Sequence, residues 1–149
     1  MNFPDVICEK VATYKEVSGK HPFVIDEFEH SYFVVGDHHF YEGYSMLFLK
    51  RHVRELHELS ESETTGLALE LQRATKAVND CFSPWKMNHM LLGNQAQHIH
   101  WHIIPRYEKD PYHKSYPFSD VMKGEVDLSD YAHSDESALE LATKIRKYL

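Results

Sequence analysis

The chain has 149 residues, of which 42% are hydrophobic and 13% aromatic, so it suits one compact domain that spans residues 1–149. Its 16 basic residues against 23 acidic ones give a net charge of −7, which argues against a nucleic-acid partner because such a partner requires a basic face. An anionic ligand remains compatible with this charge if cations gather locally. The sequence shows neither a secretory pattern nor an apolar run of membrane-crossing length, so we expect a cytoplasmic protein with no membrane partner.

The two cysteines, Cys8 and Cys81, are far apart and neither belongs to a C-x-x-C pair. This spacing indicates neither a disulfide framework nor a four-cysteine zinc site, and we expect both to be buried thiols. Twelve histidines are many for this length, and the surplus is concentrated around residues 98–102.

The first half of the chain predicts a short helix and three strands. Apolar residues at helical spacing, with Pro4 suited to a first turn, indicate a helix over residues 4–14. Runs rich in β-branched and aromatic residues predict strands over 22–26, 31–35 and 44–49. A polar link joins the first two strands, which favours antiparallel neighbours.

The second half predicts a long helix, a hairpin and a terminal helix. Ser60 and Glu63 have capping-box spacing and open a helix that we expect to run to about residue 81. Residues 87–92 predict a fourth strand, which a bend at Gly93 joins to a fifth strand that should stop at Pro105. Residues 107–131 lack periodicity and are interpreted as loop, and Ser134 is the expected N-cap of the last helix. The predicted class is α+β, an antiparallel sheet with one long helix and shorter terminal helices.

The fifth strand carries the most informative pattern. His98, His100 and His102 alternate with large apolar residues, as in a half-buried strand. Because alternate strand residues lie roughly 6.6 Å apart, the three imidazoles should form a row about 13 Å long on one face. Arg106 follows the proline and should lie at the rim of this row.

Three interpretations of the histidine row are open. The first is a solvated face or a structural polar network. The second is a metal site, either on the row itself or as a structural site in which His98 or His52 accompanies Cys8. The third is nucleophilic catalysis, in which a neutral imidazole held at one nitrogen attacks with the other. In that case the central His100 is the best oriented, while its neighbours hold phosphate oxygens or move a proton.

At these residues the sequence resembles the histidine triad (HIT) family of nucleotide hydrolases and transferases. Residues 98–104 match the family signature, three histidines alternating with apolar residues, at every position. The resemblance covers roughly residues 23–107, and the continuation through Pro105-Arg106-Tyr107 and Asp110-Pro111 looks most like the bacterial diadenosine-polyphosphate-hydrolase-like branch. It implies a five-stranded HIT-like fold, usually in a homodimer.

The resemblance also implies roles for individual residues. His100 would attack the α-phosphorus of a nucleoside phosphate and form a nucleotidyl-histidine, His98 would orient His100 through its backbone carbonyl, and His102 would bond phosphate or leaving group. The remaining positions are implied ligand contacts: Asn94, Gln95, Asn88 and Arg106 for phosphate, and Asp37 for the ribose hydroxyls. The remaining histidines, including His38, are expected at the surface or in loops without a role.

Two departures from the family pattern stand out. Tyr44 occupies the place of a common family histidine, and the C-x-x-C of zinc-bearing members is absent, with only Cys8 present. We therefore expect no cofactor and no metal, and a small-molecule nucleotide as substrate. The leading hypothesis is hydrolysis of dinucleoside polyphosphates or nucleoside phosphoramidates. Its rivals are a metal-dependent hydrolase that uses the histidine row as zinc ligands and a nucleotide-binding module without catalysis.

Overall fold

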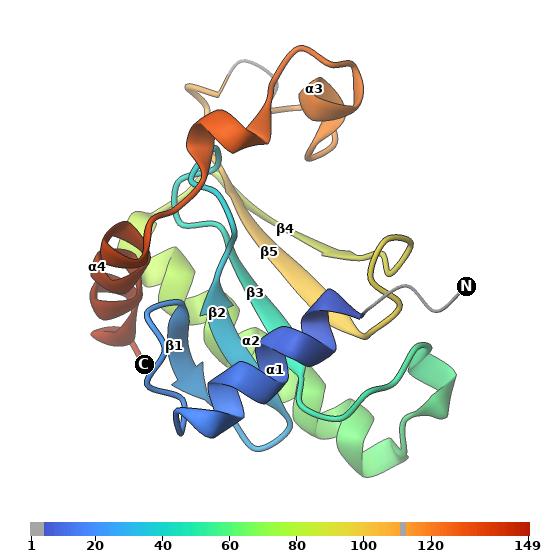
Figure 1. The fold of residues 1–149 in the computed structure, drawn as a ribbon. Helices are drawn as coiled ribbons and strands as arrows, with labels where there is room; N and C mark the ends of the chain where they lie inside the picture. Colours follow the sequence, from blue (N-terminus) through green and yellow to red (C-terminus); the bar gives the residue numbers. More distant parts are fainter. Residues whose placement is uncertain (1–4, 111–112) are drawn as a thin grey trace.

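The computed structural model describes residues 5–110 and 113–149, and Figure 1 shows a sheet with helices on both of its faces. The sheet is five-stranded and antiparallel, which confirms the predicted α+β class. Pro4 and Pro111, on which two of the sequence arguments drew, lie outside the described residues. Across the described residues, no helix combines the length and the hydropathy that a membrane crossing requires.

The sheet places the histidine strand between two neighbours. Its strands are β1 (Val24–Glu27), β2 (Ser31–Val35), β3 (Ser45–Leu49), β4 (Lys86–Leu91) and β5 (His100–Arg106). They lie in the order β1-β2-β3-β5-β4, and each pair of neighbours is antiparallel. The predicted hairpin of the last two strands is therefore confirmed, and β5 has a hydrogen-bonded neighbour on each side.

The prediction that β5 stops at Pro105 is wrong, because the strand continues through Arg106. Pro105 pairs with Met87 of β4, whereas pairing between β5 and β3 ends at Ile103. Pro105 thus lies where β5 has a neighbour on one side only, and proline is tolerated at such edge positions.

The helices form a layer on each face of the sheet (Figure 1). Helix α1 (Val6–Glu16) packs its buried Ile7, Val11 and Tyr14 on one face. Helices α2 (Glu61–Phe82) and α4 (Asp135–Arg146) pack on the other face through alanines and β-branched residues. Small residues let two helices share one sheet face at close range.

Both predicted helix starts are confirmed. The Ser60 hydroxyl accepts the Glu63 backbone N–H at 3.2 Å, and the Glu63 carboxylate accepts the Ser60 N–H at 2.9 Å. Ser134 caps α4 in the same way, since its hydroxyl accepts the Ser137 N–H. Each cap satisfies backbone donors that lack a partner within the helix.

The interpretation of residues 107–131 as loop is wrong in part. This segment contains the short helix α3 (Ser119–Met122) and a 3-10 turn, η2 (Leu128–Tyr131), and a further 3-10 turn, η1 (Leu56–Glu58), precedes α2. Elements of three or four residues are too short to show an apolar period, so periodicity could not reveal them.

Candidate functional site

The alternation along β5 places the histidines and the apolar residues on opposite faces, as predicted. His100 and His102 pair across the sheet with Phe48 and Met46, which belong to the core beneath α1. Ile103 packs instead in the core beneath α2 and α4. The histidine row therefore faces α1.

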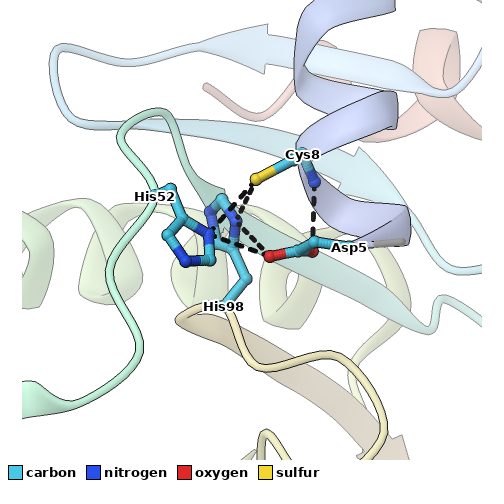
Figure 2. Close-up of side chains that lie close together, drawn as sticks. All are labelled: Asp5, Cys8, His52 and His98. Carbon is cyan, nitrogen blue, oxygen red and sulfur yellow. Dashed lines mark hydrogen bonds and ion pairs between the residues drawn. The ribbon is translucent and has the colours of Figure 1, made fainter. Parts of the chain in front are cut away.

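His98 lies just before β5 and is 1% exposed. Its Nε2 donates to the Leu49 backbone carbonyl at 2.7 Å, and because a carbonyl only accepts, this bond fixes the proton on Nε2. The unprotonated Nδ1 faces the Cys8 Sγ at 3.3 Å, as Figure 2 shows. Burial lowers the pKa of His98, which favours the neutral form of this ring.

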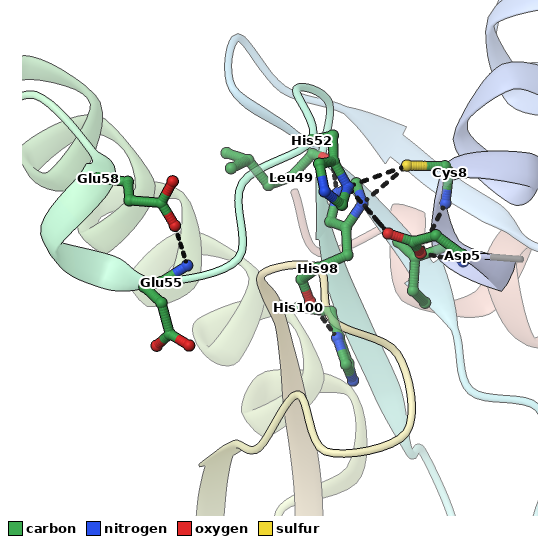
Figure 3. A network of polar contacts seen from close by, with 9 residues as sticks. Asp5, Cys8, Leu49, His52, Glu55, Glu58, His98 and His100 are labelled. Carbon is green, nitrogen blue, oxygen red and sulfur yellow. Dashed lines mark hydrogen bonds and ion pairs between the residues drawn. The ribbon is translucent and has the colours of Figure 1, made fainter. Parts of the chain in front are cut away.

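His100 is 7% exposed and is held by the residue two places before it. Its Nδ1 donates to the His98 backbone carbonyl at 2.7 Å. Figure 3 shows the His98 ring turned toward Cys8 and Asp5, and the His100 ring pointing away from them. Since the carbonyl takes the Nδ1 proton, the lone pair of the neutral His100 ring lies on Nε2. Among the described residues, none hydrogen-bonds to that nitrogen.

His102 lies within hydrogen-bond distance of a tyrosine that immediately precedes β3. The Tyr44 hydroxyl lies 2.6 Å from the His102 Nδ1, and the two rings are nearly parallel, with an interplanar angle of 8°. The centroids of the His100 and His102 rings are 5.0 Å apart. Burial, and next the neighbouring His100, lower the pKa of His102 to about 4, so His102 is neutral at neutral pH.

A cavity of about 510 Å³ opens beside α1. Its wall includes Asp37, Lys10 and Tyr14, together with His21, Phe23 and His133. The Asp37 carboxylate forms a 2.5 Å ion pair with the Lys10 ammonium, and the charge of Asp37 also acts on the pKa of His102. The predicted ribose contact Asp37 therefore lies between this cavity and the histidine row.

The other predicted phosphate contacts lie in two places. Asn94 and Gln95 are exposed in the connection between β4 and β5 that leads to the row. Asn88 lies on β4 opposite Ile104, and its Oδ1 accepts from the Arg106 Nη1 at 3.3 Å. The structure thus joins Asn88 to Arg106, but among the described residues no hydrogen bond joins these amides to the three imidazoles.

Arg106 does not lie at an exposed rim, so that expectation is wrong. It is 2% exposed, donates to the Ser115 carbonyl at 3.0 Å and lies over the Tyr41 ring at 5.3 Å. Position 106 has the parity of the histidines on β5, which directs this side chain under the segment that follows the strand. His38 lies in the loop between β2 and β3, which is one of the two expected places, but it is not at the surface, because it is 6% exposed and stacks on Tyr44 at 4.6 Å.

A second group of side chains gathers behind His98. Asp5, Cys8, His52 and His98 each offer one metal-binding atom, and these atoms all lie within 4.8 Å of one another (Figure 2). A thiolate, two imidazoles and a carboxylate are the ligand types that zinc binds, so this donor set fits zinc. The group contains His98 but neither His100 nor His102, so the structure does not favour zinc held on the row itself.

The sequence predicts His98 or His52 as a partner of Cys8 in a structural metal site but gives no such prediction for Asp5. Asp5 and Cys8 are three residues apart at the start of α1, which places them on one side of a helical turn. This i, i+3 spacing was a usable signal. The approach of α1 to the loop after β3 is a tertiary contact that the sequence does not show.

An antiparallel sheet with three alternating histidines, two of which are held through Nδ1, defines an α+β protein with an imidazole-based site. The chain belongs to the HIT domain family, whose model matches residues 19–109, more than half of its length. Among curated proteins, none matches the chain by sequence.

Solved structures show the same fold at low sequence identity. A histidine triad protein from Sinorhizobium meliloti 1021 has a TM-score of 0.73 and 20% identity, with 85% of this chain and 89% of that chain covered. A zinc-bound histidine triad family protein from Mycobacterium smegmatis has a TM-score of 0.66 and 19% identity over 97% and 92% of the two chains. The diadenosine triphosphate hydrolase of Plasmodium falciparum, solved with cyclomarin A, has a TM-score of 0.67 and 19% identity over 97% and 94%.

Proposed function

We propose that this protein is a nucleotide hydrolase that acts at the α-phosphate of dinucleoside polyphosphates or nucleoside phosphoramidates through a covalent nucleotidyl-His100 intermediate. The observation that carries this proposal is the bond from the His100 Nδ1 to the His98 carbonyl. It leaves the nucleophilic lone pair on Nε2 and holds the ring in one orientation. Family membership and the fold shared with a diadenosine triphosphate hydrolase support the substrate class.

The proposed reaction has two displacements at phosphorus. The His100 Nε2 attacks the α-phosphorus, a P–N bond forms, and the P–O or P–N bond to the leaving group breaks with its electron pair. A polyphosphate leaving group departs as its anion and an amine leaving group takes its proton from solvent, while His102 is the nearest imidazole to supply a hydrogen bond to it. Water then attacks the same phosphorus and gives up a proton to solvent, the P–N bond to His100 breaks, and the nucleoside monophosphate and neutral His100 are released.

We assign the cavity beside α1 to the nucleoside. Its volume of about 510 Å³ lies within the range of small-molecule sites, and it is lined by aromatic side chains and by the carboxylates of Glu9 and Asp37. Asp37 would accept from the ribose hydroxyls. Asn94, Gln95, Asn88 and Arg106 stay proposed phosphate contacts, which would require the β4–β5 connection to lie over the phosphate chain.

We also propose a homodimer that forms along β4. This strand is an edge of the sheet as described, and the exposed Trp85 and Leu92 flank it. An unprotected edge with apolar neighbours is a surface that a second chain can pair with.

His100→Ala tests the proposed nucleophile. Turnover should fall by more than about a thousandfold while nucleotide affinity changes little, because the variant removes only the bond-forming group. His57→Ala, at an exposed histidine of η1, is the matched control and should retain turnover. Near-normal turnover by His100→Ala would reject the proposal.

Two further measurements separate the rival functions and define the substrate. Activity that survives verified removal of bound metal excludes a metal-dependent hydrolase. A panel of diadenosine polyphosphates and adenosine phosphoramidate, compared by kcat/KM, distinguishes P–O–P from P–N cleavage. Tight nucleotide binding without turnover of any member would favour the non-catalytic binding module.

A further inference from the structure

Asp5 uses its two carboxylate oxygens for different contacts. Oδ1 accepts the backbone N–H groups of Ile7 and Cys8 at 3.0 and 3.2 Å and so caps helix α1. Oδ2 points away from the helix and lies 2.9 Å from the His52 Nδ1 and 3.5 Å from the His98 Nδ1. This oxygen is buried, yet none of its contacts among the described residues has hydrogen-bond geometry.

The Cys8 sulfur completes the group at similar distances. Its Sγ lies 3.2 Å from the His52 Nδ1 and 3.3 Å from the His98 Nδ1. One thiol proton can satisfy only one of these two nitrogens. The four atoms all lie within 4.8 Å of one another, and the two nitrogens compete for one thiol proton.

These separations are near the edges of a metal tetrahedron, two of them within the expected range and two slightly shorter. Ligands at Zn–N of about 2.0 to 2.1 Å and Zn–S of about 2.3 Å are separated from each other by about 3.3 to 3.6 Å in tetrahedral geometry. The four measured edges run from 2.9 to 3.5 Å. The Nε2–H bond of His98 to Leu49 leaves its Nδ1 as the metal-binding nitrogen, which is the usual outer-shell support for a histidine ligand.

We propose that Asp5 is a metal ligand as well as a helix cap: Oδ2 binds a divalent transition metal such as zinc together with Cys8, His52 and His98, while Oδ1 holds the first turn of α1. The site joins α1, the loop after β3 and the start of the histidine strand. It therefore anchors the ring of His98, whose carbonyl orients His100. This metal site is independent of the proposed function.

Cobalt titration tests this assignment without an activity assay. The metal-free full chain should bind one equivalent of Co²⁺ and show a thiolate-to-cobalt absorption band with the visible bands of tetrahedral cobalt. Cys8→Ser should remove the thiolate band. Absence of tetrahedral binding by the wild type would overturn the proposal.

Asp5→Asn distinguishes helix capping from metal binding, because asparagine is as good an N-cap as aspartate but lacks the anionic ligand. Its Co²⁺ affinity should fall by at least about tenfold with unchanged circular dichroism. Asp127→Asn, at the aspartate that caps η2, and Cys81→Ser are the matched controls and should leave affinity unchanged. Unchanged cobalt affinity and spectrum in Asp5→Asn would show that Oδ2 is not a ligand.

A different observation carries a second inference, which rests on the proposed function. The ring of Tyr44 is enclosed: it stacks on His38 at 4.6 Å, and a Cβ added to Gly36 would lie 2.2 Å from it. Gly36 therefore leaves the space that this ring fills. The enclosed ring directs its hydroxyl to the His102 Nδ1.

We propose that Tyr44 is a positioning residue that donates its hydroxyl proton to the His102 Nδ1 and so fixes the proton of His102 on Nε2. Burial raises the pKa of Tyr44 far above its ordinary value, so the phenol keeps the proton that it donates. The groups that act on the charge of His102 are His100 on β5 and Asp37 and His38 after β2. In this tautomer His102 offers an N–H donor to phosphate or leaving group.

Tyr44→Phe keeps the ring and removes only the hydroxyl. Nitrogen-15 NMR of the wild type should show His102 neutral and protonated on Nε2, and the variant should show a mixture of tautomers. With an active substrate, kcat should fall by about tenfold with little change in KM. Tyr32→Phe, at a buried tyrosine of the same core, is the control.

The NMR result is independent of catalysis, so failure of this inference is distinguishable from failure of the proposed function. A wild-type His102 protonated on Nδ1, or a tautomer unchanged in Tyr44→Phe, would overturn the inference even if the enzyme is active. A changed tautomer with no turnover of any substrate would instead contradict the proposed function.

Discussion

His100 and His102 lie with ring centroids 5.0 Å apart, and each is hydrogen-bonded through Nδ1, one to a backbone carbonyl and the other to a phenol. The carbonyl of His98 only accepts, so His100 has its lone pair on Nε2. The phenol of Tyr44 can donate, which in our assignment gives His102 the opposite tautomer. Two neighbouring imidazoles would then present a nucleophile and a hydrogen-bond donor to one phosphate.

Buried His38 makes stability depend on pH. Burial lowers its pKa to about 4, with Asp37 opposing the shift and His133 and His39 adding to it. The unfolded chain therefore binds a proton near pH 6.5 that the folded chain does not, and stability falls as pH drops from about 6.5 to 4. Each such proton changes the free energy of unfolding by up to about 1.4 kcal/mol per pH unit.

His38→Phe should retain the ring stack. The difference in bound protons between the unfolded and folded chains, which sets the pH dependence of stability, should fall by up to one. Denaturant unfolding at several pH values between 4 and 7.5 measures the slope for both proteins. An identical slope in wild type and variant would show that His38 titrates normally in the folded chain.

The Lys10–Asp37 ion pair lies at the wall of the proposed nucleoside cavity. If Asp37 accepts from ribose, Asp37→Asn should weaken binding of a ribonucleotide by roughly tenfold and of its deoxy analogue by less, because the lost interaction involves the hydroxyls. Isothermal calorimetry with both ligands checks this. Equal losses for the two ligands would argue against a ribose contact.

The capping box at the start of α2 should contribute measurably to stability. Ser60→Ala removes the hydroxyl that accepts the Glu63 N–H and should cost about 1 kcal/mol in the free energy of unfolding. Ser62→Ala, at the exposed serine two residues later in the same helix, is the control. A loss no larger than the control's would show that the cap is not needed.

The proposed dimer predicts a mass in solution of twice the 17.5 kDa of one chain. The double substitution Trp85→Glu and Leu92→Glu should yield monomer, because it places charge at both ends of the edge strand. Met122→Glu, at a still more exposed apolar residue of α3, should leave the dimer intact. Light scattering distinguishes the two masses, and a monomeric wild type would contradict the proposal.

The parts of this protein that follow local rules could be predicted from the sequence. The period of two in β5, the capping box at Ser60 and the cap at Ser134 depend on neighbours in the chain, and each is confirmed. Long-range contacts could not be predicted. The burial of Arg106 depends on the segment after β5, and the meeting of Asp5 with His52 and His98 depends on how α1 docks.

Tyr44 illustrates the same limit. The sequence shows only a tyrosine where the family commonly has histidine, and its hydroxyl acquires a partner only when β3 pairs with β5. The side chain's function therefore depends on a strand pairing between residues 58 positions apart.

The proposed function depends on a covalent bond between His100 and the nucleotide, and rapid quench of the enzyme with substrate, followed by mass spectrometry of its peptides, detects this bond. We predict the mass of a nucleoside monophosphate on the peptide that contains His100, formed and lost within one turnover and absent from His100→Ala. Turnover of substrate with no such adduct, or an adduct on another residue, would contradict the proposed mechanism.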